Sequence, residues 1–293
     1  MMIPCFWSIE PTNACSLHCP QCPSGSQLLT RKRGYMDVEN YKKILEKIAP
    51  HALYLNLYFQ GEPTLHPQLP TLIQLAKGHG LYVALSTNGQ HINAQTARRL
   101  VRSGLDKMIV SVDGMNQRSY ETYRRGGSLD KALKSIHYVM DYKRTIGSYT
   151  PRVEMQTLAF RHNEDELPAL RRMARDLGAR FKVKTAQFYT CAPDDTLQPP
   201  DSARLSRYVR GEDGTLRLKR NLPNRCFHLL TSAVVTWEGD VLPCVFDKDA
   251  RYVFGNILKE DLSGIFKSER AKDFRKRVFS KRNTIDICKN CCY

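Results

Sequence analysis

The chain has 293 residues, and its 42% of hydrophobic residues is ordinary for a soluble protein with one large domain and a small appended one. No basic segment followed by a long apolar stretch stands at the N-terminus, so we expect neither a secretory signal nor a membrane span. The net charge of +16 is large. It would favour acidic substrates such as nucleotides, sugar phosphates or acidic peptides, or an acidic redox partner, and a solvated basic surface explains it equally well.

Strand-like and helix-like patterns alternate along the first two thirds of the chain. We expect strands at Phe6 to Ile9, Leu53 to Phe59, Leu81 to Leu85, Lys107 to Val112, Arg152 to Phe160 and Phe181 to Phe188. We expect helices at Val38 to Ala49, Gln68 to Gly78, Ala94 to Arg102, Leu129 to Arg144 and Asp165 to Leu177. Asp37 and Asn93 are placed to cap the first and third of these helices. This alternation indicates a parallel sheet with crossover helices.

Three cysteines follow the first expected strand in a CxxxCxxC arrangement, Cys15, Cys19 and Cys22. Because iron–sulfur clusters normally take four thiolates, a triplet can hold three irons of a 4Fe-4S cube and leave the fourth open for a small molecule. A zinc loop or a chance cluster is the alternative, although zinc more often uses two CxxC pairs. The triplet resembles the signature of the radical SAM enzymes, whose open iron binds S-adenosylmethionine (SAM).

The resemblance implies a chemistry and a set of cofactor contacts. Members of the family cleave SAM reductively to methionine and a 5'-deoxyadenosyl radical, which takes a hydrogen atom from the substrate. The contacts that the resemblance implies are Gln60, Gly61, Glu62 and Pro63 for the methionine amino group, and Ser86, Asn88, Ser111 and Asp113 for the ribose and the carboxylate. Each of the latter four, taken singly, could be an ordinary strand-to-turn cap.

Two positions depart from the family pattern. Gln60 replaces the first glycine of the Gly-Gly-Glu-Pro stretch, which is a mild change. Gln21 stands where many relatives have an aromatic residue against the adenine, so the sequence assigns no adenine contact.

A second set of cysteines lies near the C-terminus. It follows a segment, residues 191–225, that reads as a linker or a substrate-facing loop and includes a charged run from Arg207 to Arg220. Cys226 and Cys244 flank a hairpin-like stretch with its turn at residues 238–240, and a helical stretch from Asp261 to Phe279 leads to a CxxC pair. The candidate ligands of an auxiliary cluster are Cys226, Cys244, Cys288 and Cys291. Cys292 could replace Cys291, and a four-cysteine zinc site is the alternative.

This tail resembles the SPASM extension of radical SAM enzymes in its shortened, single-cluster form, Twitch. The two resemblances imply a partial (β/α)6 TIM-like barrel at residues 1–190 and a small α+β cluster domain, a β-hairpin plus helix, at residues 226–293. Ligands of such a barrel gather at the C-terminal strand ends. Two cysteines are left over. Cys5 fits a small buried hydrophobe, and a catalytic or ligand role stays open for Cys191.

Four cysteines fill every iron site of the auxiliary cluster, which favours electron transfer and a net two-electron oxidation. By similarity to Twitch dehydrogenases, we expect dehydrogenation of a small molecule, with flavodoxin or ferredoxin as reductant and the reducing cytoplasm as location. One alternative is a maturase that crosslinks or oxidises a ribosomally made peptide. The other is a non-catalytic iron–sulfur or zinc protein that binds nucleic acid. Candidates for the base that an oxidation needs are Glu154, Tyr189, Asp194, Asp195 and Asp247.

Overall fold

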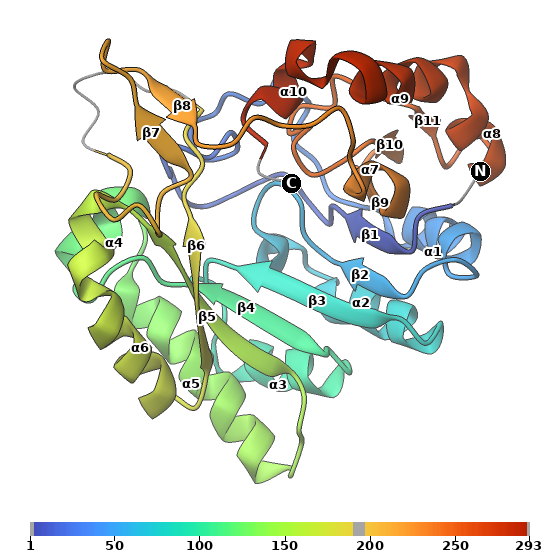
Figure 1. Cartoon of the computed structure of the whole chain (residues 1–293). Helices are drawn as coiled ribbons and strands as arrows, with labels where there is room; N and C mark the ends of the chain where they lie inside the picture. Colours follow the sequence, from blue (N-terminus) through green and yellow to red (C-terminus); the bar gives the residue numbers. More distant parts are fainter. Residues whose placement is uncertain (1–2, 190–196, 292–293) are drawn as a thin grey trace.

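The fold is taken from a computed structural model, which describes residues 3–189 and 197–291 (Figure 1). Its strands are β1 (Phe6–Ile9), β2 (Tyr54–Asn56), β3 (Tyr82–Thr87), β4 (Lys107–Ser111), β5 (Arg152–Ala159), β6 (Arg180–Thr185), β7 (Tyr208–Arg210), β8 (Leu216–Leu218), β9 (Ser232–Val235), β10 (Asp240–Leu242) and β11 (Gly255–Asn256). Its α-helices are α1 (Val38–Ile48), α2 (Leu69–Gly78), α3 (Ala94–Arg102), α4 (Gln117–Tyr123), α5 (Leu129–Thr145), α6 (Leu167–Asp176), α7 (His228–Thr231), α8 (Leu262–Lys267), α9 (Glu269–Lys281) and α10 (Asp286–Lys289). Short 3-10 turns are η1 (Pro63–Leu65), η2 (Arg161–Glu166) and η3 (Arg282–Thr284).

One sheet of nine strands organises the molecule, in the order β11-β10-β9-β1-β2-β3-β4-β5-β6. Strands β1 to β6 run parallel, and helices α3, α5 and α6 cover the outer face of β3 to β6 (Figure 1). This confirms the expected partial (β/α)6 TIM-like barrel. Both expected helix caps form, because the side chain of Asp37 accepts the N–H of Asn40 and that of Asn93 accepts the N–H of Thr96.

The C-terminal strands continue the barrel sheet instead of forming a sheet of their own. The expected hairpin forms as β9 and β10, and β9 pairs in parallel with β1, with Phe6 opposite Ser232. Helices α8 and α9 close this end of the molecule, where Phe266 meets the buried Trp7 edge to face at 6.1 Å (Figure 1). The apolar core therefore runs through both parts of the chain. The boundary expected at residue 226 stays a prediction.

Several elements differ from the sequence-based expectation. Strand β6, expected to reach Phe188, ends at Thr185. Strand β2 ends at Asn56, because the chain beyond it bends toward the cysteine loop, where the N–H of Glu62 bonds the carbonyl of Ala14 at 2.7 Å. The expected helix from Asp261 to Phe279 is two helices, since Ser268 has an extended ψ of 152° and caps α9 with its hydroxyl. The charged run from Arg207 contains an antiparallel hairpin, β7 with β8, which stands apart from the main sheet (Figure 1).

Crossing a bilayer would take a longer and more apolar helix than any found in residues 3–189 and 197–291.

Candidate active site

The loop that carries the first three cysteines leaves β1 and is closed by polar contacts at its base. The Asn13 side chain donates to the carbonyl of Lys32 at 2.8 Å and accepts from the N–H of Gly34 at 3.0 Å. The hydroxyl of Thr12 donates to the carbonyl of Gly34 at 2.7 Å. These bonds hold residues 14–31 as one loop over the sheet.

The thiols of Cys15, Cys19 and Cys22 lie close enough for the charge of each to act on the others. Burial raises the pKa of Cys15 to about 11 and that of Cys19 to about 12. The N–H of Leu17 points at the sulfur of Cys15 from 3.5 Å. Buried thiols that receive hydrogen-bond donors are suited to become thiolates once a metal replaces their protons, so this loop fits a cluster held by three cysteines.

The stretch Gln60 to Pro63 is anchored to the cysteine loop. The hydroxyl of Ser24 donates to the side-chain oxygen of Gln60 and accepts the N–H of Gly61, both at 3.0 Å. The buried carboxylate of Glu62 accepts from the hydroxyl of Thr87 at 2.7 Å and from the N–H of Asn88 at 2.6 Å. Glu62, which caps η1, thus joins the loop after β2 to the end of β3.

The four polar residues expected at the ends of β3 and β4 have different surroundings. Ser86 and Ser111 line the same cavity as Gln60, Gly61 and Cys22. The amide of Asn88 donates toward the sulfur of Cys15 from 3.9 Å. Asp113 is fully buried, and its carboxylate accepts from the N–H of Leu158 at 2.6 Å and from Arg124 at 2.5 Å.

The sequence analysis missed Arg124. It lines the cavity, forms the ion pair with Asp113 and donates toward the sulfur of Cys19 from 3.9 Å. Its position in a polar run, Tyr123-Arg124-Arg125, gives no periodic signal, so only the fold shows that it faces the cysteines.

A cavity of about 540 Å³ opens at the C-terminal ends of the parallel strands, as expected for a barrel of this kind. The cysteine loop, β3 to β6 and the loop after Cys244 all contribute to its wall. Its described lining contains four cations and no carboxylate; the cations are Arg124, Lys184, Arg207 and Lys248. Gln21, at the position where relatives often have an aromatic residue, also lines the cavity and accepts the N–H of Tyr189 at 2.8 Å.

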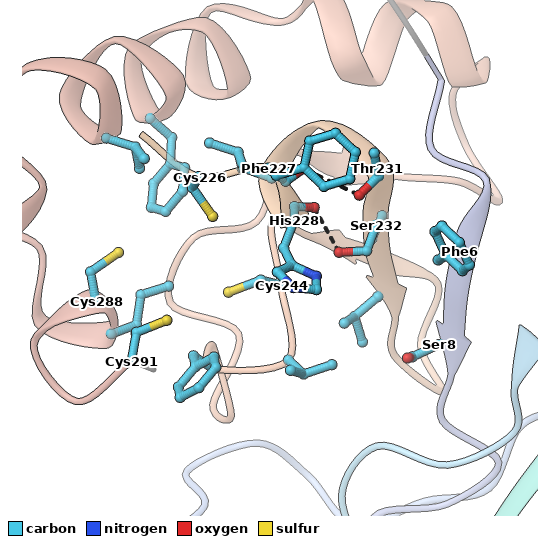
Figure 2. Close-up of a pocket in the computed structure, with 18 of the residues that line it drawn as sticks. Phe6, Ser8, Cys226, Phe227, His228, Thr231, Ser232, Cys244, Cys288 and Cys291 are labelled. Atoms are coloured by element: carbon cyan, nitrogen blue, oxygen red, sulfur yellow. Dashed lines mark hydrogen bonds between the residues drawn. The ribbon is translucent and has the colours of Figure 1, made fainter. Parts of the chain in front are cut away.

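The four cysteines expected to hold an auxiliary cluster surround a second cavity, of about 470 Å³ (Figure 2). Figure 2 shows Cys226, Cys244, Cys288 and Cys291 around a common space. Burial raises the pKa of Cys244 to about 12 and also raises that of Cys288. Four thiols around one largely apolar cavity fit a fully ligated cluster. Cys292 lies outside the described residues.

A buried arginine, Arg282, supports these thiols and was also missed. It is 1% exposed, donates to the sulfur of Cys291 at 3.4 Å and to the carbonyl of Arg225 at 2.7 Å. Because Arg282 begins η3 directly after the basic helix α9, the sequence pattern indicated a surface residue at this position.

The two cavities share a wall. Val245 and Phe246, directly after Cys244, line both the 470 Å³ cavity of the auxiliary cysteines and the 540 Å³ cavity beside Cys22. These two residues therefore form part of the wall between the two cavities.

The five candidate bases fall in different places. Tyr189 lines the 540 Å³ cavity, and burial raises its pKa, so it keeps its proton at neutral pH. Glu154 is near the start of β5, away from the cavity, and pairs with Lys107 at 3.0 Å. Asp247 is buried and its carboxylate accepts the N–H groups of Arg251 and Tyr252 at 2.8 and 2.9 Å, which shapes the loop after Cys244. Asp194 and Asp195 lie outside the described residues, as does Cys191.

Two protein families match this chain. Residues 9–174 match the radical SAM superfamily, and residues 226–292 match the iron-sulfur cluster-binding domain SPASM.

Curated relatives extend along most of the chain. It is 24% identical to the tungsten-containing aldehyde ferredoxin oxidoreductase cofactor-modifying protein of Pyrococcus furiosus, over 97% of this chain and 86% of that protein. It is also 24% identical to the mycofactocin maturase MftC of Mycobacterium ulcerans, over 86% of this chain and 71% of that protein.

Solved structures share the fold. The crystal structure of BtrN in complex with AdoMet and 2-DOIA has a TM-score of 0.61 at 22% identity, covering 100% of this chain and 95% of that one. Streptococcus suis SuiB bound to the precursor peptide SuiA has a TM-score of 0.71 at 15% identity, covering 100% and 72%.

Proposed function

Because this chain belongs to the radical SAM superfamily and carries a SPASM domain, we propose that it completes a two-electron oxidation, the dehydrogenation of a small molecule. The two domains imply a SAM-binding 4Fe-4S cluster and an auxiliary iron–sulfur cluster. When bound, these groups supply the one-electron cleavage of SAM and an acceptor for the electron that the substrate loses.

Different residues of the chain are proposed to hold the two clusters and SAM. We propose Cys15, Cys19 and Cys22 as ligands of the first cluster, and Cys226, Cys244, Cys288 and Cys291 as ligands of the auxiliary one. Gln60, Gly61, Ser86 and Ser111, which line the cavity beside Cys22, are proposed to contact SAM directly. Glu62, Pro63, Asn88 and Asp113 lie outside the lining of that cavity. Because Glu62, Asn88 and Asp113 bond to neighbouring elements, we propose that they fix the strand ends that carry the contacts.

The observation that carries the proposal is the wall that both cavities share. A substrate in the 540 Å³ cavity would be separated from the cavity of the auxiliary cysteines by a wall that includes Val245 and Phe246, and an electron could cross this wall. A wall shared by the two cavities would be unnecessary in a protein whose auxiliary cysteines only stabilised the fold.

We also propose which residues handle protons on the side of the cavity that faces the substrate. Tyr189 is protonated at neutral pH, and its O–H donates to the side-chain oxygen of Gln187 at 2.9 Å. We propose that a substrate oxygen replaces Gln187 as the acceptor of this hydrogen bond. Asp194 and Asp195 stay candidates for the base itself. For the first electron we propose a flavodoxin or a ferredoxin in the cytoplasm.

A peptide maturase is the second candidate, and one feature of the site favours it. A groove of about 280 Å³ lies next to the main cavity and shares with it Pro23, Gln187, Tyr189, Phe246 and Lys248. An extended peptide could lie in such a groove with one side chain in the cavity. MftC and the SuiB complex are relatives whose names refer to maturation or to a precursor peptide.

The test compares SAM cleavage with substrate oxidation. Replacing Cys226 and Cys244 by Ala should spare part of the 5'-deoxyadenosine formation and stop turnover to the oxidised product, because the electron acceptor is lost. The matched control is Cys5→Ala, which removes a thiol that does not line the auxiliary cavity and should leave both activities intact. Both products are measured by chromatography with anaerobically reconstituted protein. Full product formation by the double variant would refute the proposal.

A further inference from the structure

The buried Arg282 interacts with three of the four cysteines that Figure 2 shows around the 470 Å³ cavity. Its guanidinium donates from Nη2 to the sulfur of Cys291 at 3.4 Å. Burial raises the pKa of Cys288, and a hydrogen bond from the Arg282 side chain acts against that rise. The charge of Cys226 also acts on the guanidinium. One buried cation is thus placed beside three proposed ligands of the auxiliary cluster.

Contacts with the backbone hold Arg282 in this position. Its Nη1 donates to the carbonyl of Arg225 at 2.7 Å, directly before Cys226. Its backbone N–H donates to the side-chain oxygen of Asn224 at 3.0 Å, and the amide of Asn224 donates to the carbonyl of Ser280 at 2.7 Å. These acceptors are carbonyl and amide oxygens without net charge, so the bonds fix the guanidinium and do not cancel its positive charge.

The rest of the 470 Å³ cavity is largely apolar, which matters for any charge placed in it. Its wall includes Leu229, Val234, Phe246, Phe274 and Val278. A cluster held by four thiolates carries net negative charge, and an added electron would increase that charge in surroundings that solvate it poorly. Hydrogen bonds to the ligand sulfurs and a nearby cation favour the more negative, reduced form. A residue that supplies both raises the reduction potential.

We infer that Arg282 raises the reduction potential of the auxiliary cluster, so that the cluster can accept the electron of the proposed oxidation. In that step the substrate radical left by hydrogen-atom transfer loses one electron to the cluster and one proton to the base, which gives the oxidised product. Arg282 keeps its own proton and acts only through the sulfurs, so it is a positioning residue. The inference rests on the proposed function, because it names the residue that makes the auxiliary cluster a suitable acceptor.

The experiment is a redox titration of the anaerobically reconstituted full chain, followed by electron paramagnetic resonance. SAM changes the signal of the cluster that binds it, so the signal that SAM leaves unchanged belongs to the auxiliary cluster. In Arg282→Gln, the ratio of reduced to oxidised auxiliary cluster at a fixed potential should fall about tenfold, which corresponds to about 59 mV for one electron. Arg282→Lys keeps the charge but loses the planar fork of donors, so its potential should lie between those of wild type and Arg282→Gln.

Two control variants separate this effect from other causes. Lys281→Gln removes the exposed positive charge of the preceding residue and should leave the potential unchanged. Asn224→Ala removes the acceptor of the Arg282 N–H but keeps the guanidinium, so it should lower the potential much less than Arg282→Gln does. The potential of the first cluster should stay the same in every variant.

Equal potentials in wild type and Arg282→Gln would overturn the inference. An equal fall in Lys281→Gln would assign the effect to surface charge, and an equal fall in Asn224→Ala would assign it to the folding of the segment before Cys226; either result also overturns it. If Arg282→Gln binds no auxiliary cluster, Arg282→Lys decides: a potential equal to that of wild type, or loss of the cluster here too, refutes the inference. A wild-type chain without a second signal would instead refute the proposed function, whereas a second signal with unchanged potentials refutes only the role of Arg282.

Discussion

Gly61 shows at the scale of one residue how the cofactor loop is positioned. Its φ is +74°, and a Cβ built there would lie 2.5 Å from the carbonyl oxygen of Thr12 and 2.6 Å from that of Ala14. Both the backbone conformation and the close approach therefore require glycine. Gly80 has the same φ of +74° but has no atom within 4 Å of such a Cβ.

This difference gives a matched pair of variants. Gly80→Ala should cost about 1 kcal/mol of unfolding free energy, because only the backbone is strained. Gly61→Ala should cost about 1–2 kcal/mol more and should lower the iron bound after reconstitution, since the loop of Cys15 must move. Urea denaturation measures the free energy of unfolding, and iron analysis measures the iron bound after reconstitution. If both substitutions lowered the unfolding free energy and the bound iron equally, the close approach of Gly61 to the carbonyl oxygens of Thr12 and Ala14 would have no effect of its own.

At the scale of elements, a buried ion pair joins β1, the cysteine loop and the loop after Cys244. Both carboxylate oxygens of Glu10 accept from Arg31 at 2.8 Å, and the two side chains are 0% and 7% exposed. Glu10 also accepts the N–H of Trp237 at 3.3 Å, and Arg31 reaches the carbonyl of Lys248. The pair thus fixes the loop of the first cluster against the part of the chain that lines both cavities.

Glu10→Gln should destabilise the fold by about 3 kcal/mol, because it leaves a buried guanidinium without its counter-charge. Glu39→Gln is the control, since it breaks an exposed pair with Lys42 at 2.7 Å and should cost no more than about 0.5 kcal/mol. The measurement is the free energy of unfolding in urea. A cost for Glu10→Gln as small as that of the control would show that the pair does not hold these loops together.

At the scale of the whole molecule, the barrel and the C-terminal part share a sheet and a core. Strand β1 is paired on one side with β2 and on the other with β9, so β9 covers an edge of the barrel sheet. Trp7 packs against Phe266 of α8 at 6.1 Å. Removing this part would expose both an unpaired strand and a large aromatic residue.

We therefore expect a chain that ends at residue 225 to aggregate when it is expressed or refolded. Size-exclusion chromatography with light scattering measures the aggregation of this truncated chain. The full-length variant with Cys226 and Cys244 replaced by Ala keeps β9 and should elute as the wild type does. A truncated chain that stays monodisperse and cleaves SAM would mean that the barrel is independent of its C-terminal strands.

Features that depend on short spacing along the chain could be predicted from the amino-acid sequence. The CxxxCxxC triplet, the strand ends at Ser86 and Ser111, the caps at Asp37 and Asn93 and the hairpin before Cys244 all follow from local patterns, because neighbours in sequence are neighbours in space. The family, the fold class and both cofactors were reached in this way.

Only the tertiary structure decided which distant residues meet. It joined β9 to β1, placed Arg124 beside Cys19 and Arg282 beside Cys291, and brought Lys184, Arg207 and Lys248 to one cavity. It also showed that Glu154 pairs with Lys107 and that Asp247 accepts two backbone N–H groups of its own loop, two contacts of expected bases that the sequence did not indicate. The physical reason is that a side chain's partner depends on packing between elements far apart in the chain, which neither periodicity nor motif spacing encodes.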